Sequence, residues 1–91
     1  MELKISAATL SKFEGKAKMF FDVCINNDII VKGFKLVDGS NGMFVSNPRE
    51  KSGEQYFDRV IFLNGELKSE LENHAIQYYG NLVVKNKESK E

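Results

Sequence analysis

The sequence predicts an α+β domain, in which an antiparallel β-sheet of four to five strands, connected as a meander, carries one C-terminal α-helix on one face. Three patterns support this fold class. The first half of the chain alternates apolar and polar residues with the period of a strand. Asn, Asp and Gly residues separate these stretches and mark turns. The last third changes to the spacing of an amphipathic helix.

The first strands are expected over residues 3–10, 17–26 and 29–37. A loop around Gly15 connects the first two, and the polar turn 26–28 connects the second and third. Both connections are short, so consecutive strands are expected to pair antiparallel.

The third strand is apolar on both faces. Ile29, Val31 and Val37 alternate with Ile30, Phe34 and Leu36. We expect one face to meet the helix and the other to meet a second subunit or the curl of the sheet itself. This pattern motivates a homodimer that forms through strand edges or through the third strand.

A tight hairpin turn is expected between the third and fourth strands. Its residues are Asp38, Gly39, Asn41 and Gly42, since glycine adopts positive φ without a Cβ clash and Asx side chains bond to the local backbone. The fourth strand runs over residues 43–45, before proline withdraws a backbone donor.

Residues 48–55 are predicted to form a charged loop, followed by an extended segment over 56–63. Asn64 is a favourable helix N-cap. The helix is expected over 64–79, and the residues of its buried face are Leu67, Leu71, Ala75 and Tyr78.

The helix is expected to stop at Gly80, a favoured residue after a helix C-terminus. A short edge strand over 81–84 then completes a single domain of residues 1–84. The charged segment 85–91 is expected to be a frayed tail.

The composition of the chain limits the partners and the location that can be expected. Among the 91 residues, 13 Lys and Arg balance 13 Asp and Glu, so no global field draws the molecule towards nucleic acid or an anionic membrane. No apolar run approaches the roughly 18 to 20 residues that span a bilayer, so no membrane partner is expected. One cysteine, and no secretory leader in the first residues, predict a cytoplasmic location.

The residues do not assemble a catalytic or metal site. His74 stands alone on the predicted helix, and Cys24 lies alone within a strand. General acid–base chemistry and four-ligand zinc sites need more partners than these. We therefore expect no enzymatic activity and no cofactor.

Aromatic side chains are abundant for so small a domain. We expect most of them to fill the core and one or two to lie on the surface, where bases can stack on them. The residues considered are Phe13, Phe20, Phe34, Phe44, Tyr56, Phe57, Phe62, Tyr78 and Tyr79.

The region from about Ile29 to Tyr79 resembles the stage V sporulation protein G (SpoVG) family of bacterial regulators of septation and gene expression. The matching pieces are the Asp38-Gly39 turn, the strand Gly42-Met43-Phe44-Val45, Pro48, the basic loop Arg49 to Lys51, and the helix start Leu63-Asn64. The resemblance implies a small cytoplasmic homodimer that binds DNA or RNA and has no catalytic activity.

The resemblance implies that Arg49, Lys51 and Lys68 bind nucleic acid. We add Lys32 and Lys35, because a ligand must meet these lysines before it meets the helix. Three features depart from the family pattern, namely Glu50 within the basic loop, Glu70 in place of a frequent lysine, and Ile61-Phe62 in place of His-Pro.

The predicted helix is acidic, which favours an alternative. A protein-interaction module on the same scaffold, without nucleic-acid binding, would contact a basic protein through Glu66, Glu70 and Glu72. In that case substitution of these residues matters and substitution of Arg49 does not.

Overall fold

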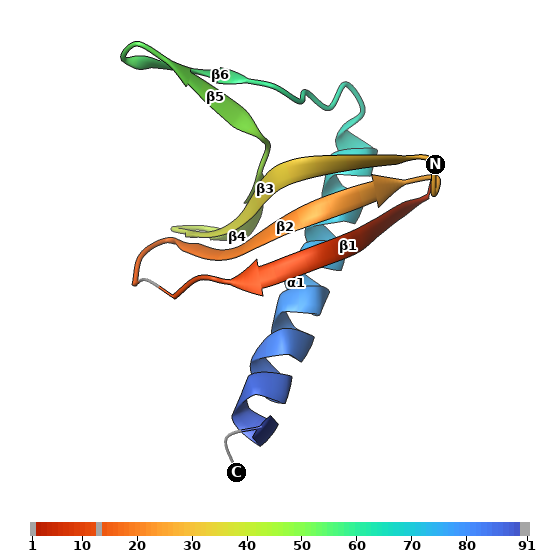
Figure 1. Cartoon of the computed structure of the whole chain (residues 1–91), viewed down its shortest axis with the longest axis vertical. Helices are drawn as coiled ribbons and strands as arrows, with labels where there is room; N and C mark the ends of the chain where they lie inside the picture. The colour runs from red at the N-terminus through yellow and green to blue at the C-terminus, as the bar shows by residue number, and fades with distance from the viewer. Residues whose placement is uncertain (1, 13, 90–91) are drawn as a thin grey trace.

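The computed structural model describes residues 2–12 and 14–89, with side chains as far as Lys85. Six strands precede one long helix (Figure 1). The elements are β1 (Leu3–Leu10), β2 (Ala17–Ile25), β3 (Ile29–Gly39), β4 (Gly42–Ser46), β5 (Arg49–Ser52), β6 (Gln55–Asp58) and α1 (Gly65–Ser89).

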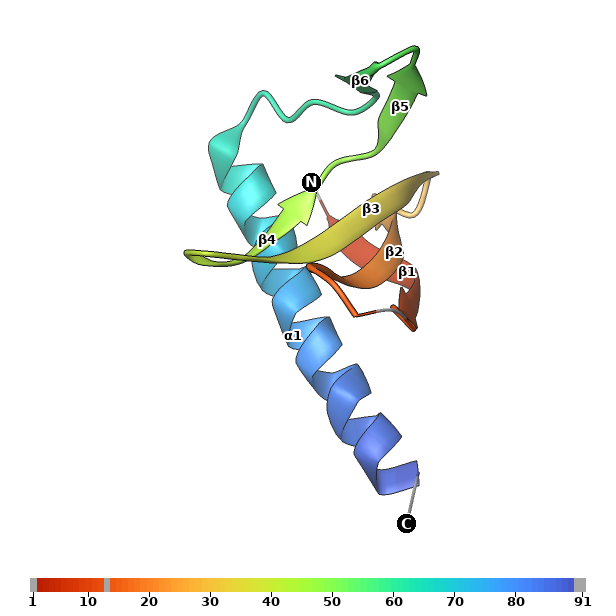
Figure 2. The same cartoon turned by 90° about the vertical axis from the view of Figure 1, so that its left-hand side faces the viewer.

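Strands β1 to β4 form one antiparallel sheet in sequence order, and β5 and β6 form a second, two-stranded sheet. Helix α1 packs on one face of the larger sheet (Figures 1 and 2). The predicted α+β class, the meander and the C-terminal helix are confirmed. The core lies between helix and sheet and consists of Leu3, Met19, Phe21, Val23, Phe34, Leu36, Val45, Leu71 and Ala75.

A β-bulge in β3 explains why this strand looks apolar on both faces. The register changes from Val23↔Val31 to Phe21↔Phe34, and Gly33 in between has a φ of 98°. One extra residue reverses the alternation of side chains. Ile29 and Val31 before the bulge therefore share the helix-side face with Phe34 and Leu36 after it, and the two-sided pattern does not require a second subunit.

Two turns take the local conformations that their residues favour. Asn26 and Asn27 have φ values of 54° and 61°, and the Asp28 N–H donates to the Ile25 carbonyl at 2.9 Å, as in a type I′ turn. In the β3–β4 hairpin, Gly39 pairs with Gly42. A Cβ on Gly39 would lie 2.8 Å from the Phe44 ring, so this strand position requires glycine.

The segment after Pro48 is a hairpin and not the predicted loop. Strands β5 and β6 pair from Arg49↔Asp58 to Ser52↔Gln55 around a turn in which Gly53 has a φ of 64°. All of the residues of both strands are exposed. Charged and polar residues occupy both faces, so the sequence lacks the apolar alternation that marks a packed strand. Of the segment expected to be extended, 56–63, only its start lies in a strand.

Helix α1 begins as predicted at Gly65, and the Glu66 N–H donates to the Asn64 side chain at 2.9 Å in the geometry of an N-cap. The predicted stop at Gly80 and the edge strand over 81–84 are wrong, since the helix continues to Ser89. The tail 85–91, predicted to be frayed, is thus helical as far as Ser89. Its distal part extends beyond the sheet (Figures 1 and 2).

The buried face of the helix also differs in one position. Leu67, Leu71 and Ala75 face the core as expected, and Tyr79, instead of Tyr78, is the half-buried aromatic that packs against it. In the described part of the chain, no helix combines the length and the apolar character needed to cross a membrane.

Candidate functional site

The face of the four-stranded sheet opposite the helix, here called the open face, carries exposed aromatic side chains. Phe20 on β2 is 41% exposed and Phe44 on β4 is 44% exposed. In the pairing of β2 with β3, Phe20 lies directly opposite Lys35. The open face therefore combines ring surfaces with a cation at its centre.

Exposed aromatics are more numerous than predicted. Phe34 is buried and Phe62 half-buried, whereas five of the nine residues considered are exposed, namely Phe20, Phe44, Tyr56, Phe57 and Tyr78. Phe13 lies outside the described residues. The small sheet has only one covered face, so the core has no room for the others.

The β5–β6 hairpin has two chemically different faces, because residues alternate along each strand. Arg49 and Lys51 pair with Asp58 and Tyr56 on one face. On the other, Glu50 pairs with Phe57, and the Arg59 Nη1 contacts the Glu50 Oε2 at 2.7 Å. The predicted basic residues of this segment thus lie together on one face, with Tyr56 opposite Lys51, and Glu50 lies on the opposite face.

This hairpin face borders a cavity of about 290 Å³, here called the hairpin cleft. Strand β3 contributes Gly33 and Lys35 to it, and the hairpin contributes Arg49 and Tyr56, while Ser46 and Asn47 close one side. The hairpin cleft brings together two of the predicted cations, Lys35 and Arg49, which are 14 positions apart in the sequence.

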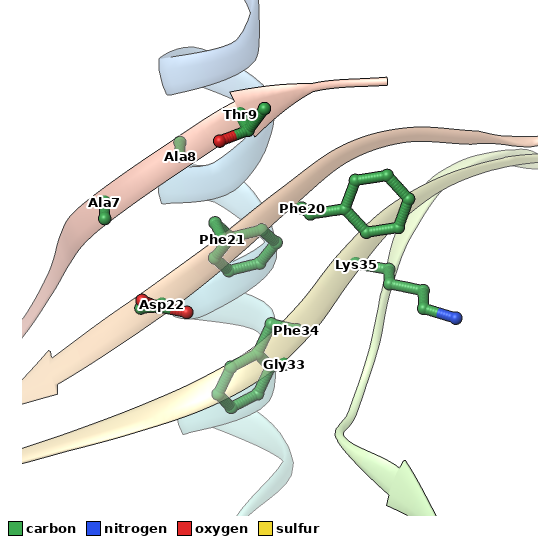
Figure 3. Close-up of a pocket in the computed structure, with 9 residues that line it drawn as sticks. All are labelled: Ala7, Ala8, Thr9, Phe20, Phe21, Asp22, Gly33, Phe34 and Lys35. Carbon is green, nitrogen blue, oxygen red and sulfur yellow. The ribbon is translucent and has the colours of Figure 1, made fainter. Parts of the chain in front are cut away.

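A second cavity, of about 210 Å³, lies on strands β1 to β3 and shares Gly33 and Lys35 with the hairpin cleft. We call it the sheet groove. Figure 3 shows Ala7 and Thr9, Phe20 and Asp22, and Lys35 along its three strands, with the helix behind them. Lys35 therefore borders both the sheet groove and the hairpin cleft.

Charge on this surface is partly compensated. The Arg49 Nε contacts the Asp58 Oδ1 at 2.8 Å, and the other guanidinium N–H groups remain for a further acceptor. The Lys51 ammonium lies 5.9 Å from the centre of the Tyr56 ring, within the range of a cation–π contact. Within residues 2–12 and 14–85, no ion pair involves Lys35 or Lys51.

Lys68 does not join this surface. Its Nζ donates to the Asn47 Oδ1 at 2.7 Å and lies 5.3 Å from the centre of the Phe62 ring. Burial lowers the pKa of the Lys68 ammonium from its ordinary 10.5, while the negative charges of Glu72 and Asp58 act in the opposite direction. Lys68 is half-buried at the base of the hairpin.

Lys32 lies in the β3 bulge, is exposed, and lines neither cavity. The turn residues Asp38, Gly39, Asn41 and Gly42 lie at the β3–β4 turn and likewise line neither cavity. Sequence reasoning missed two participants, Asn47 and Asp58, and considered Tyr56 only as one of nine aromatic residues. The register of the hairpin places Tyr56 opposite Lys51 and Asp58 opposite Arg49, while Asn47 meets Lys68 through the packing of the helix, and no local pattern reveals either.

The acidic helix face is less available than predicted. Glu72 is half-buried, and its Oε2 accepts a hydrogen bond from the Val45 N–H at 3.0 Å. Glu66 and Glu70 are exposed. Only these two of the three acids considered for a protein contact are free to meet a partner.

His74 is exposed beside Glu70, with 3.9 Å between the His74 Nε2 and the Glu70 Oε1, and Cys24 is a half-buried free thiol on β2. Among the side chains described, those of residues 2–12 and 14–85, no three from His, Cys, Asp or Glu gather in an arrangement that could hold a metal ion.

Comparison with known proteins identifies the family. The family model described as SpoVG matches residues 1–81. The chain belongs to the SpoVG family. A relative from Clostridioides difficile, named "Putative septation protein SpoVG", is 31% identical over 85 residues, which cover 90% of this chain and 92% of the relative.

Two further relatives have lower identity. Proteins of the same name from Exiguobacterium and from Caldanaerobacter subterraneus are each 26% identical, over 72 and 80 residues. The first match covers 78% of this chain and 73% of the relative, and the second covers 85% and 88%. The predicted membership is therefore confirmed, at moderate identity and over nearly the whole domain.

Proposed function

We propose that this SpoVG family member is a non-enzymatic regulator that binds DNA or RNA in the cytoplasm, in a process related to the septation named in its relatives. The observation that supports this most is the hairpin cleft, where Lys35, Arg49 and the exposed Tyr56 line one cavity. Cations beside an exposed ring match a nucleotide chain, which offers phosphates and flat bases together.

The arrangement favours a single strand over a duplex. Phosphates meet Lys35, Arg49 and Lys51, while bases stack on Tyr56 of the hairpin cleft and on Phe20 of the sheet groove. In a duplex the base faces are already stacked and are not available to these rings. Because few cations contribute and the chain carries no net charge, we expect moderate affinity with a shallow dependence on salt.

Fluorescence polarisation tests the proposal, with labelled single-stranded and duplex probes of DNA and RNA at about 50 and 200 mM salt, a range in which phosphate contacts weaken visibly. We expect the single-stranded probes to bind more tightly and to weaken as salt increases. Absence of binding at tens of micromolar protein contradicts the proposal. It would favour the alternative of a protein-interaction module, with Glu66, Glu70 and the open face as the surface to map.

Self-association belongs to the same proposal. In the described part of the chain, β1 has no strand partner on its outer edge, whereas the outer edge of β4 already donates the Val45 N–H to Glu72. Pairing of two β1 edges would extend the sheet and leave both hairpin clefts open. Sedimentation at micromolar concentration is expected to give a dimer, and a monomer contradicts this part of the proposal.

A further inference from the structure

The base of the β5–β6 hairpin is held by a small network of hydrogen bonds that we call the hairpin clamp. Its residues are Asn47, Pro48, Arg59, Val60 and Lys68. Asn47 is central, since its Nδ2 donates to the Val60 carbonyl at 3.1 Å and its Oδ1 accepts from Lys68 at 2.7 Å. The Arg59 N–H donates to the Pro48 carbonyl at 2.8 Å. The network thus joins the segment that precedes β5 to the segment that follows β6.

Lys68 connects this network to the core. Its ammonium lies over the Phe62 ring, and Phe62 packs at a tilt against the buried Phe34, with 6.4 Å between ring centres. Phe34 in turn stacks on Phe21, with 5.5 Å between centres. Lys68 is a residue of α1, so its side chain links the helix to the base of the hairpin.

Apart from the clamp, little holds the hairpin in place. Every residue of β5 and β6 is exposed, and the hairpin stands clear of the larger sheet at the end where α1 begins (Figures 1 and 2). Within the clamp, Pro48 is buried, and a Cβ on Gly33 would lie 3.5 Å from its ring, so this proline and Asn47 are the two anchors of the hairpin. An exposed hairpin on two anchors changes orientation when one of them is lost.

We propose that Lys68 is a positioning residue, which holds Asn47 and thereby fixes the hairpin above the open face, and that it does not contact phosphate. The effect of this on binding rests on the proposed function; the effect on the hairpin does not. The role differs from that of Arg49 and Lys51, which lie on the exposed cleft side of the hairpin.

The free protein gives the first test. Hydrogen exchange is measured in Lys68→Met, which keeps the stem over Phe62 and removes the ammonium, and in Asn47→Ala, which removes the partner without a change of charge. Lys85→Met, an exposed lysine of the same helix, is the control. In both clamp variants, the amides of the hairpin and of Arg59 should exchange roughly tenfold faster than in the wild type, because a hydrogen bond from a charged donor is lost.

Amides of β1 to β3 should stay within twofold of the wild type, which separates a local effect on the hairpin from a general loss of stability. Unchanged hairpin exchange in both variants overturns the proposal, and so does an equal increase across the whole sheet. This outcome is decided without nucleic acid, so a failure of the proposed function leaves it intact.

Binding gives the second test. If Lys68 is a positioning residue, Lys68→Met should lower the affinity for a single-stranded probe and leave the salt slope unchanged. Asn47→Ala should have the same effect, and the double variant should bind no more weakly than either single variant. For a phosphate contact, Lys68→Met makes the slope shallower by about 0.7, and Asn47→Ala, which releases the ammonium, does not weaken binding. The second pattern overturns the proposal.

Discussion

Glu72 on the helix and Val45 on the edge strand β4 are joined by a hydrogen bond of 3.0 Å from the Val45 N–H to the Glu72 Oε2. An edge strand exposes one row of N–H and C=O groups that no neighbouring strand satisfies. The carboxylate satisfies one of these donors beside the core, where Val45 is only 2% exposed. The bond also ties helix and sheet together independently of apolar packing.

Replacement of Glu72 by alanine should therefore destabilise the fold. An N–H that loses its partner in a buried setting costs about 1 to 3 kcal/mol in the free energy of unfolding. Urea denaturation measures this difference. Glu70→Ala is the matched control, because Glu70 is exposed on the same helix, and it should change stability by less than about 0.5 kcal/mol. Equal effects of the two substitutions contradict the role given to Glu72.

Two glycines should respond to alanine with opposite signs. Gly33 has a φ of 98° in the β3 bulge, which L side chains rarely adopt, so Gly33→Ala should cost about 1 to 3 kcal/mol. Gly80 lies within α1 with open space around it, so Gly80→Ala should stabilise by about 0.8 to 1 kcal/mol. Thermal denaturation distinguishes the two. Stabilisation by Gly33→Ala would show that the bulge is not formed.

Adjacent aromatics on the hairpin test which of its faces binds. Tyr56 lines the hairpin cleft, and Phe57 points to the other side. Tyr56→Ala should weaken a single-stranded probe by about 1 to 3 kcal/mol, the value of one stacked base, with the salt slope unchanged. Phe57→Ala should bind as the wild type does. The reverse ranking places the ligand on the face of Glu50 and Arg59.

The lowered pKa of Lys68 gives stability a dependence on pH. Burial makes the folded protein hold this proton less tightly than the unfolded chain, whose lysine titrates at 10.5. The unfolded state therefore binds more protons between the folded pKa and 10.5, and stability rises with pH across that window. This contribution to stability is complete above pH 10.5, and it is lost as the pH falls through the pKa that Lys68 has in the folded protein.

Urea denaturation of the wild type and of Lys68→Met from pH 7 to about 10.5 isolates this contribution, since the other titrating groups are common to both proteins. The stability of the wild type relative to the variant should increase with pH. A difference that stays constant or decreases contradicts the inferred burial of the ammonium.

Sequence reasoning recovered the parts of the fold that local chemistry specifies. The meander follows from alternation and Asx turns, and Asn64 begins the helix because its side chain accepts from the first turn. The helix end was wrong because one glycine costs only about 1 kcal/mol within a helix. The following residues, Leu82 among them, still pack on the core.

The site was predicted less completely. Arg49 and Lys35 line the hairpin cleft with Tyr56, and Lys51 lies opposite Tyr56 on the hairpin, while their part in binding stays a prediction. Lys68 does not line the cleft, because its environment depends on Asn47, 21 positions away. A charged exposed hairpin and a one-residue bulge leave no periodic signal, so neither the cleft nor the true faces of β3 follow from the pattern alone.

The central claim is that nucleic acid binds the hairpin face of Arg49 and Lys51, and the salt dependence of one double variant tests it most directly. The measurement is the affinity of Arg49→Glu/Lys51→Glu for a single-stranded probe between about 50 and 200 mM salt. Arg59→Glu, on the opposite hairpin face, is the control. We expect weaker binding by the double variant and a salt slope shallower by roughly 1.4, since each phosphate contact contributes about 0.7. An affinity and slope equal to those of the wild type would contradict it.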